Sequence, residues 1–313
     1  MAGGFGGLLA NSETVDRLLD EMDEADKKSL QGWYWFDWAN QAFALTVITV
    51  VVPTLLSNMF NLANGGSADY GGMTFTGDSF YAVVLGISSV FVAIVSPVLG
   101  AIADRMPIKK KILKVYTVVG ILFTGLMGLA PYMDEDSSYK FLAICLIMGN
   151  IGFAGGHAIY SAFLPYLGEK RLMDHISSWG YAYGFLGGCI LLTFHLAVGL
   201  KFGFENPDVQ CFVFVTSALW WLGFSIPMFL NTPEPEIPNP TEYSTTLEAV
   251  ADGLREIKNT FMEIRRYKVL SLFMCGYLLF YDGVNAIGGL AAAYADSVLR
   301  IDFTMNFVLL LSA

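Results

Sequence analysis

Long apolar runs are the feature that most constrains how this chain can fold. A helix needs about 20 mostly apolar residues to cross a bilayer. Seven segments meet this requirement: 33–60, 79–103, 111–131, 139–165, 177–200, 210–230 and 267–294. An eighth run begins near residue 303 and is still apolar at residue 313, so we expect a truncated bundle. Only 15% of the residues are charged, against about 25% in soluble domains, which predicts an all-α polytopic membrane protein.

The distribution of lysine and arginine predicts the orientation of the spans. Twelve of these residues lie in the links after the second, fourth and sixth spans, and three lie in the opposite loops. Because positively charged loops stay in the cytoplasm, we expect an integral, multi-pass protein with a cytoplasmic N-terminus. The net charge of −10 and the lack of a basic surface argue against a nucleic-acid partner. No residue spacing predicts a metal site, and no cofactor motif is present.

Four regions follow from this pattern. They are an acidic cytoplasmic tail (1–32), an N-terminal six-helix bundle (33–230), a cytoplasmic linker (231–266) and the incomplete start of a C-terminal bundle (267–313). The linker begins with prolines, which exclude a helix, and continues as an amphipathic helix from a capping box of Thr245 and Glu248. We expect this helix to lie along the membrane surface or to pack beneath the bundle.

The link after the second span carries a candidate gate. It reads GAIADRMPIKKK, with Gly100 four residues before Asp104 and Arg105. A glycine at this position lets two helices approach closely. The two charged residues can pair across helices at the cytoplasmic mouth and so hold one conformation. The alternative is a basic loop that only fixes the topology.

Five motifs occur in one order along the chain: FDWANQAF, SPVLGAIADR, NIGFAGGHAIYSAFLPYL, SSWGYAYGFLGG and LFYDGVNAI. Together they resemble the unidentified major facilitators, a family of the major facilitator superfamily that includes the fungal vacuolar amino-acid effluxer linked to autophagy. The resemblance implies a major facilitator fold, with seven complete spans and the start of an eighth from a twelve-span bundle. It also implies amino-acid efflux, across a plasma membrane in a prokaryote or a vacuolar-type membrane in a fungus. Residues 106–108 depart from the Gly-Arg pair usual in the gating loop of the superfamily.

Polar side chains inside the spans are the candidate binding residues. The first span carries Asp37, Asn40 and Gln41, and the seventh carries Asp282 and Asn285 at the same spacing. The two aspartates and the two asparagines are each 245 positions apart, and spans one and seven are equivalent helices of a facilitator. Ionisable residues within a membrane are costly and usually functional. These residues are therefore predicted to line one cavity that binds solute or protons.

The candidate residues differ in their expected depth. By hydropathy, Asp282 lies near the middle of its span, whereas Asp37 lies closer to the cytoplasmic side. We therefore expect Asp282 to be the substrate or proton site and Asp37 to belong to a gate or vestibule. Tyr281 precedes Asp282, and the fourth span adds His157 and Tyr160. For His157, a titrating role and a structural role at a helix contact are both open.

These features predict a secondary active transporter that moves a small polar solute, with amino acids as the expected class and proton coupling as one option. The lipid bilayer and the solute are the expected partners, and the sequence does not fix the oligomeric state. A facilitator-fold protein that handles lipid or supports assembly, without a soluble substrate, is the alternative. An enzyme is not expected, because the chain lacks HExxH and GxSxG motifs.

Overall fold

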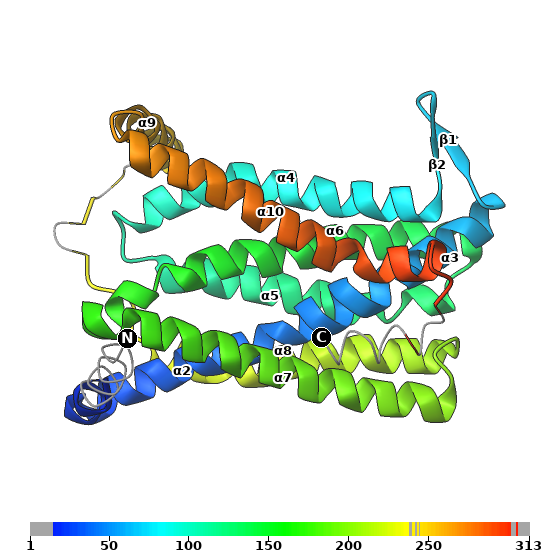
Figure 1. Ribbon diagram of the computed structural model, residues 1–313, viewed down its shortest axis with the longest axis horizontal. Helices are drawn as coiled ribbons and strands as arrows, with labels where there is room; N and C mark the ends of the chain where they lie inside the picture. Colours follow the sequence, from blue (N-terminus) through cyan, green and yellow to red (C-terminus); the bar gives the residue numbers. More distant parts are fainter. Residues whose placement is uncertain (1–14, 238–239, 242, 244, 302–304, 306–313) are drawn as a thin grey trace, which may run out of the picture.

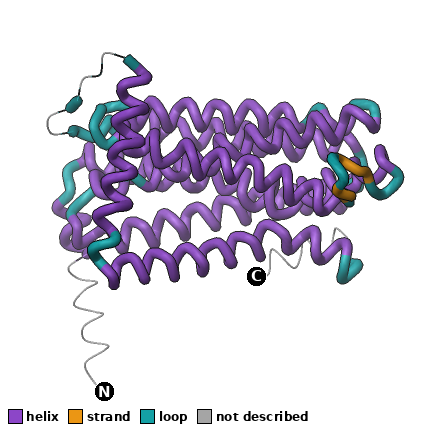
Figure 2. The backbone as a smooth tube through the Cα atoms, turned by 90° about the horizontal axis from the view of Figure 1, so that it is seen from above, coloured by secondary structure: helices purple, strands orange, loops and turns teal. Residues whose placement is uncertain are grey.

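The computed structural model describes residues 15–237, 240–241, 243, 245–301 and 305. The side chains of several helical residues, including Asp282 and Asn285, lie outside this description. Figure 1 shows long helices running side by side, with a hairpin projecting at one end and α9 (Thr246–Ile264) at the other. Helices make up nearly all of the tube in Figure 2, and the predicted all-α class is confirmed.

Six helical spans form the main bundle. The first consists of three consecutive segments: α2 (Glu24–Gln41), η1 (Ala42–Val51) and α3 (Val52–Asn64). The other five are α4 (Gly77–Ala103), α5 (Lys109–Met127), α6 (Glu135–Ser161), α7 (Met173–Phe202) and α8 (Pro207–Asn231). All six are long and apolar enough to cross a membrane, as predicted.

The remaining elements connect and flank these spans. The linker helix α9 leads into α10 (Lys268–Ser297), which covers the predicted seventh span. The predicted eighth span lies almost entirely outside the described residues. The hairpin and the short helical turns are β1 (Ala68–Tyr70), β2 (Met73–Phe75), η2 (Ala130–Tyr132), η3 (Leu164–Tyr166) and η4 (Lys170–Leu172).

The first span begins earlier than hydropathy predicts. The side chain of Asp23 accepts a hydrogen bond of 2.7 Å from the backbone nitrogen of Asp26, and α2 starts at Glu24 instead of residue 33. Acidic residues favour a helix N-terminus because they satisfy or face its free N–H groups. Hydropathy detects only the apolar part of such a helix. The segment 1–32, predicted as a tail, therefore includes the start of α2.

The middle of the first span is a π-helix, which the sequence analysis did not predict. Within η1, the hydroxyl of Thr49 donates to the carbonyl of Ala44 at 2.8 Å, and the backbone nitrogen of Val52 bonds to the carbonyl of Val47. π-Helical segments are rare and are often found at functional sites. The wider winding changes the angular position of the residues that follow it.

Glycines bring helices of the bundle into backbone contact. Gly152 of α6 lies against Gly120 of α5, and a Cβ added at Gly152 would collide with backbone atoms. A Cβ added at Gly184 of α7 would lie 2.9 Å from the side chain of Asp37 of α2. Small residues permit such close approach between membrane helices. The α5–α6 and α2–α7 contacts therefore depend on glycine at these positions.

The linker helix packs beneath the bundle, against α4. A Cβ added at Gly253 of α9 would lie 3.2 Å from the carbonyl oxygen of Val98. Thr245 caps α9 as predicted, because its hydroxyl accepts a 3.2 Å hydrogen bond from the backbone nitrogen of Glu248. A Cβ at Gly100 would meet no atom of the described residues within 4 Å, so the close approach expected at Gly100 stays a prediction. This face of α4 is not covered by a described helix, and the tight contact between α4 and α9 is at Gly253.

Substituting Gly152 with alanine should destabilise the bundle. The new Cβ would overlap the backbone of α5, and overpacking of this kind costs about 1–3 kcal/mol. Gly86→Ala in α4 is the matched control, because its Cβ would meet no described atom within 4 Å. Thermal unfolding in detergent should show a lower midpoint for Gly152→Ala only. Equal midpoints for both variants would contradict the packing described.

Candidate functional site

Asp37 of α2 lies inside the bundle, against α7. Its side chain and that of Asn40 are buried, at 4% and 1% exposure. A Cβ added at Gly184 would lie 2.9 Å from Cγ of Asp37 and 2.9 Å from Cγ of Gln41. Among the described residues, Oδ1 of Asp37 and Oδ1 of Asn40 have no hydrogen-bond partner. Because buried polar groups are normally paired, this face of α2 is a candidate binding site.

Two predicted residues of α6 lie beside this face. The ring of Tyr160 stacks on Trp33 at 4.4 Å and on Phe36 at 5.1 Å, and the indole nitrogen of Trp33 donates to the Tyr160 carbonyl at 3.2 Å. Tyr160 is within electrostatic range of Asp37, and the ring of His157 is 5.7 Å from that of Tyr160. In the described part of the chain, the Tyr160 hydroxyl and Nδ1 of His157 are also unpaired. We call these four residues the Asp37 cluster: Asp37, Asn40, His157 and Tyr160.

The predicted residues of the seventh span lie on α10. This helix contacts η1 and α3, the central and far parts of the first span. Tyr181 of α7 interacts electrostatically with both Asp37 and Tyr281. The side chains of Asp282 and Asn285 lie outside the described residues. Their place in a shared cavity with Asp37 therefore stays a prediction.

The two aspartates occupy equivalent positions along their helices. Asp37 is as far from Glu24, where α2 begins, as Asp282 is from Lys268, where α10 begins, to within one residue. Asp37 is therefore as far inside its helix as Asp282. The apolar part of α2 still begins only near Trp33, so the difference in membrane depth expected from hydropathy stays a prediction.

Arg105 links the α4–α5 turn to the linker helix. Its guanidinium bonds to Asp252 of α9, and its second amino group donates to Oε2 of Glu256 at 2.6 Å. The hydroxyl of Tyr243 also donates to Asp252 at 2.8 Å, and the backbone nitrogen of Thr241 donates to the Arg105 carbonyl at 2.9 Å. The hydrogen bond from Tyr243 and the charge of Arg105 hold the pKa of Asp252 below its ordinary value. This network attaches α9 to the bundle at the end that we call the basic end.

Asp104 pairs locally, at the start of α5. Its carboxylate is 2.7 Å from Nζ of Lys109, which is 1% exposed and lies 5.2 Å above the ring of Tyr166. A buried ammonium group needs such a partner. The backbone nitrogen of Lys110 donates to Glu234 at 2.9 Å, so the start of the linker is also fixed to α5. Of the two predicted gate charges, Arg105 reaches another helix, and Asp104 holds the turn.

Sequence reasoning missed the partners of Arg105. Asp252 and Glu256 are spaced i, i+4 on the polar face of α9, so they share one side of the helix. This pair of acidic residues on one helix face, in a chain with a basic α4–α5 link, could have predicted an ion pair with Arg105. No such signal marks η1 or the contact between Gly184 and Asp37, because each depends on how helices meet in three dimensions.

The fold and the buried polar cluster are those of a polytopic membrane protein of the facilitator type. A family model described as "Vacuole effluxer Atg22 like" matches residues 25–313. The chain therefore belongs to the Atg22-like vacuole effluxer family, and the resemblance inferred from its motifs is confirmed. This family is one of transporters and not of enzymes, as predicted.

The curated relatives of this chain are longer proteins. The chain is 26% identical over 279 residues to an "Uncharacterized MFS-type transporter YxiO" of Bacillus subtilis, covering 87% of the chain and 61% of the relative. It is 21% identical over 314 residues to "Autophagy-related protein 22" of Kluyveromyces lactis, covering 88% of the chain and 62% of the relative. The chain thus spans about three-fifths of the length of these two relatives.

Releasing Arg105 should detach α9 from the bundle. In the full-length protein without native cysteines, spin labels at Lys114→Cys and Lys258→Cys would report the α5–α9 distance. Arg105→Gln removes both ion pairs and should broaden and lengthen the distance distribution. Glu263→Gln, an exposed charge change on the same helix, is the control and should leave the distribution unchanged. An unchanged distribution in Arg105→Gln would contradict the proposed attachment.

The ion pair between Arg105 and Asp252, which attaches α9 to the bundle, should persist in mild acid. Because the pKa of Asp252 is lowered in the folded state, its stabilising contribution is complete above the ordinary aspartate pKa. The contribution is lost only as the pH falls through the lowered value. The distance distribution should therefore be constant from neutral pH to about pH 5 and broaden below about pH 4. Broadening between pH 7 and pH 6 would contradict this assignment.

Proposed function

We propose that the protein is a secondary active transporter that moves a small polar solute by alternating access, with amino acids as the solute class and efflux as the direction. The observation that carries the proposal is the Asp37 cluster, in which unpaired polar atoms from α2 and α6 gather inside an apolar bundle. Membership of a family described as vacuole effluxers supports the direction of transport. Amino acids follow from the resemblance to the fungal effluxer.

The cluster has the chemistry to bind a zwitterion. The carboxylate of Asp37 would bind an ammonium group through charge-assisted hydrogen bonds, or would take up and release a proton. Asn40 and Gln41 have amide donors and acceptors, and Tyr160 and His157 can each donate or accept one further bond. Gly184 sets the distance between α7 and these groups. A small shift of α7 against α2 would therefore change the access of solute to Asp37.

The second repeat would provide the other half of the site. Asp282 and Asn285 repeat the spacing of Asp37 and Asn40 at an equivalent helical position, and Tyr281 precedes them on α10. In facilitator folds, the two halves rock about a site near the midplane. We therefore assign Asp282 to substrate or proton binding together with Asp37. Asp37 is a full member of this site and not only part of a vestibule.

The alternative of a lipid-handling or assembly protein fits the Asp37 cluster poorly. Such a protein needs an apolar interior and gains nothing from unpaired buried carboxylate and amide oxygens, which are costly to bury. The orientation is proposed from the Lys and Arg bias, with the basic end and the N-terminus in the cytoplasm. A vacuolar-type membrane is the proposed location in a fungal cell. The Arg105 network would then act as a cytoplasmic gate.

Asp37→Asn should abolish most of the transport. Hydrogen bonds to charged groups contribute about 1.5–3 kcal/mol, so solute flux should fall about tenfold or more. The measurement is efflux of labelled amino acids from proteoliposomes containing the full-length protein, with and without a pH gradient. Asp174→Asn, an exposed change at the start of α7, is the control. Wild-type flux in Asp37→Asn under every gradient would contradict the assignment.

Asp282→Asn tests the equivalence of the two repeats. If both aspartates belong to one site, this variant should lose flux to a similar extent as Asp37→Asn in the same assay. The double variant should be little worse than either single variant, because residues that act as a unit are not additive. Normal flux in Asp282→Asn alone would place the site in the first repeat only.

A further inference from the structure

A cavity lies at the end of the bundle opposite the Arg105 network. It has a volume of about 110 Å³ and is formed by α3, the turn between α7 and α8, and the first turns of α8. In Figure 1, the α7–α8 turn and the hairpin lie at one end, and α9 lies at the other. The cavity is therefore separate from the gate, and none of the residues that line it belongs to the Asp37 cluster.

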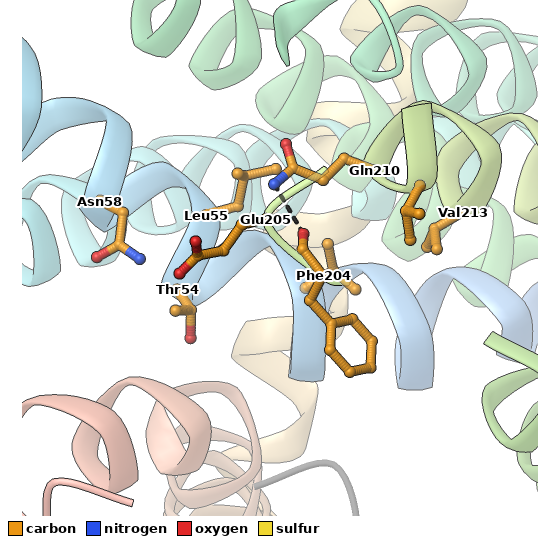
Figure 3. Close-up of a pocket in the computed structure, with 9 residues that line it drawn as sticks. Thr54, Leu55, Asn58, Phe204, Glu205, Gln210 and Val213 are labelled. Atoms are coloured by element: carbon orange, nitrogen blue, oxygen red, sulfur yellow. Dashed lines mark hydrogen bonds between the residues drawn. The ribbon is translucent and has the colours of Figure 1, made fainter. Parts of the chain in front are cut away.

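The cavity combines an apolar floor with a polar rim. The floor is formed by Leu55, Val209 and Val213. The rim carries Asn58 and Glu205, both of which are exposed to solvent. Figure 3 shows the carboxylate of Glu205 between the side chains of Asn58 and Thr54. This arrangement suits a solute with a short apolar body and one strongly polar end.

The buried hydroxyl of Thr54 is evidence for a binding site that does not depend on the charge of Glu205. The Thr54 side chain is 7% exposed, it lines the cavity, and its hydroxyl has no hydrogen-bond partner among the described residues. Gln210 differs, because its amide nitrogen donates to the Phe204 carbonyl at 3.0 Å and so holds the turn. Glu205 forms no ion pair within the described part of the chain. A carboxylate and a buried hydroxyl are thus both available to a ligand.

We propose that this cavity is a second binding site, which takes the ammonium group of a small solute with a short apolar chain. The Glu205 carboxylate accepts a charge-assisted hydrogen bond from the ammonium. Thr54 and Asn58 accept its remaining N–H groups, and the carbon chain lies on Leu55 and Val213. A carboxylate ligand is disfavoured, because Glu205 repels it. This binding does not depend on transport or on the Asp37 cluster.

The test measures binding of three probes of equal chain length to the full-length protein in lipid nanodiscs. These probes are n-butylammonium, n-butanol and butyrate, followed by saturation-transfer NMR at neutral pH. We expect n-butylammonium to bind more tightly than butanol, and butyrate to bind least. Glu205→Gln should weaken n-butylammonium binding about tenfold, because it removes the charge from the hydrogen bond. Thr54→Val, of nearly the same size, should weaken it to a smaller extent.

Matched variants separate this site from general effects. Glu135→Gln removes an exposed carboxylate from the start of α6, outside the cavity, and should leave n-butylammonium binding unchanged. Measuring the proteins with and without Glu205→Gln in the Asp37→Asn background removes binding at the transport site from the signal. The weakening caused by Glu205→Gln should persist in that background, so a failure of the transport proposal and a failure of this one are distinguishable. Equal binding of butanol and n-butylammonium, or unchanged n-butylammonium binding in Glu205→Gln, would overturn the proposal.

Discussion

The contact between Gly184 of α7 and the Asp37 face of α2 is the constraint on which the rest of the site depends. It places a carboxylate and an amide in a largely apolar interior, which is costly unless these groups bind something. A Cβ at Gly184 would lie 2.9 Å from side-chain atoms of Asp37 and Gln41, so either these side chains or α7 would have to shift. Glycine therefore lets one helix cover the polar face of another without filling the space beside it.

The two ends of the bundle are built differently. At the basic end, Arg105 holds α9 through two carboxylates, and Lys109 is buried against Asp104. At the other end, the turn between α7 and α8 borders a cavity whose rim carries Glu205, which forms no ion pair among the described residues. One end is closed by ion pairs and the other offers a site for a cation. This asymmetry fits a protein whose two ends open at different stages of a cycle.

Much of the fold could be predicted from the sequence, because a bilayer admits few alternatives to long apolar helices. The six spans and the cap of α9 at Thr245 followed from hydropathy and local hydrogen bonding. The start of α2 was misplaced, because the charged residues after Asp23 resemble a tail although they stabilise a helix N-terminus. The close contact at Gly253 was not predicted, because it depends on the packing of α9 on α4.

The candidate site was predicted in part. Asp37, Asn40, His157 and Tyr160 were all selected as rare polar residues within spans, and in the described part of the chain each has a buried polar atom without a hydrogen-bond partner. Their common role in binding stays a prediction. Their depth in the membrane stays a prediction, because it depends on where the apolar part of each helix enters the bilayer. The partners of Arg105 and the π-helix η1 were missed, since neither has a strong local pattern. Contacts between segments that are far apart in the sequence cannot be predicted from local residue patterns alone.

The central claim is that the Asp37 carboxyl faces the path of the transported solute. Dicyclohexylcarbodiimide reacts with carboxyl groups in apolar surroundings, so its labelling of Asp37 in the full-length protein, quantified by mass spectrometry, tests this claim most directly. The account predicts that Asp37 is labelled and that the transported amino acid protects it, while labelling elsewhere is unchanged. Labelling of Asp37 that no transported solute reduces, or no labelling at any pH, would contradict it.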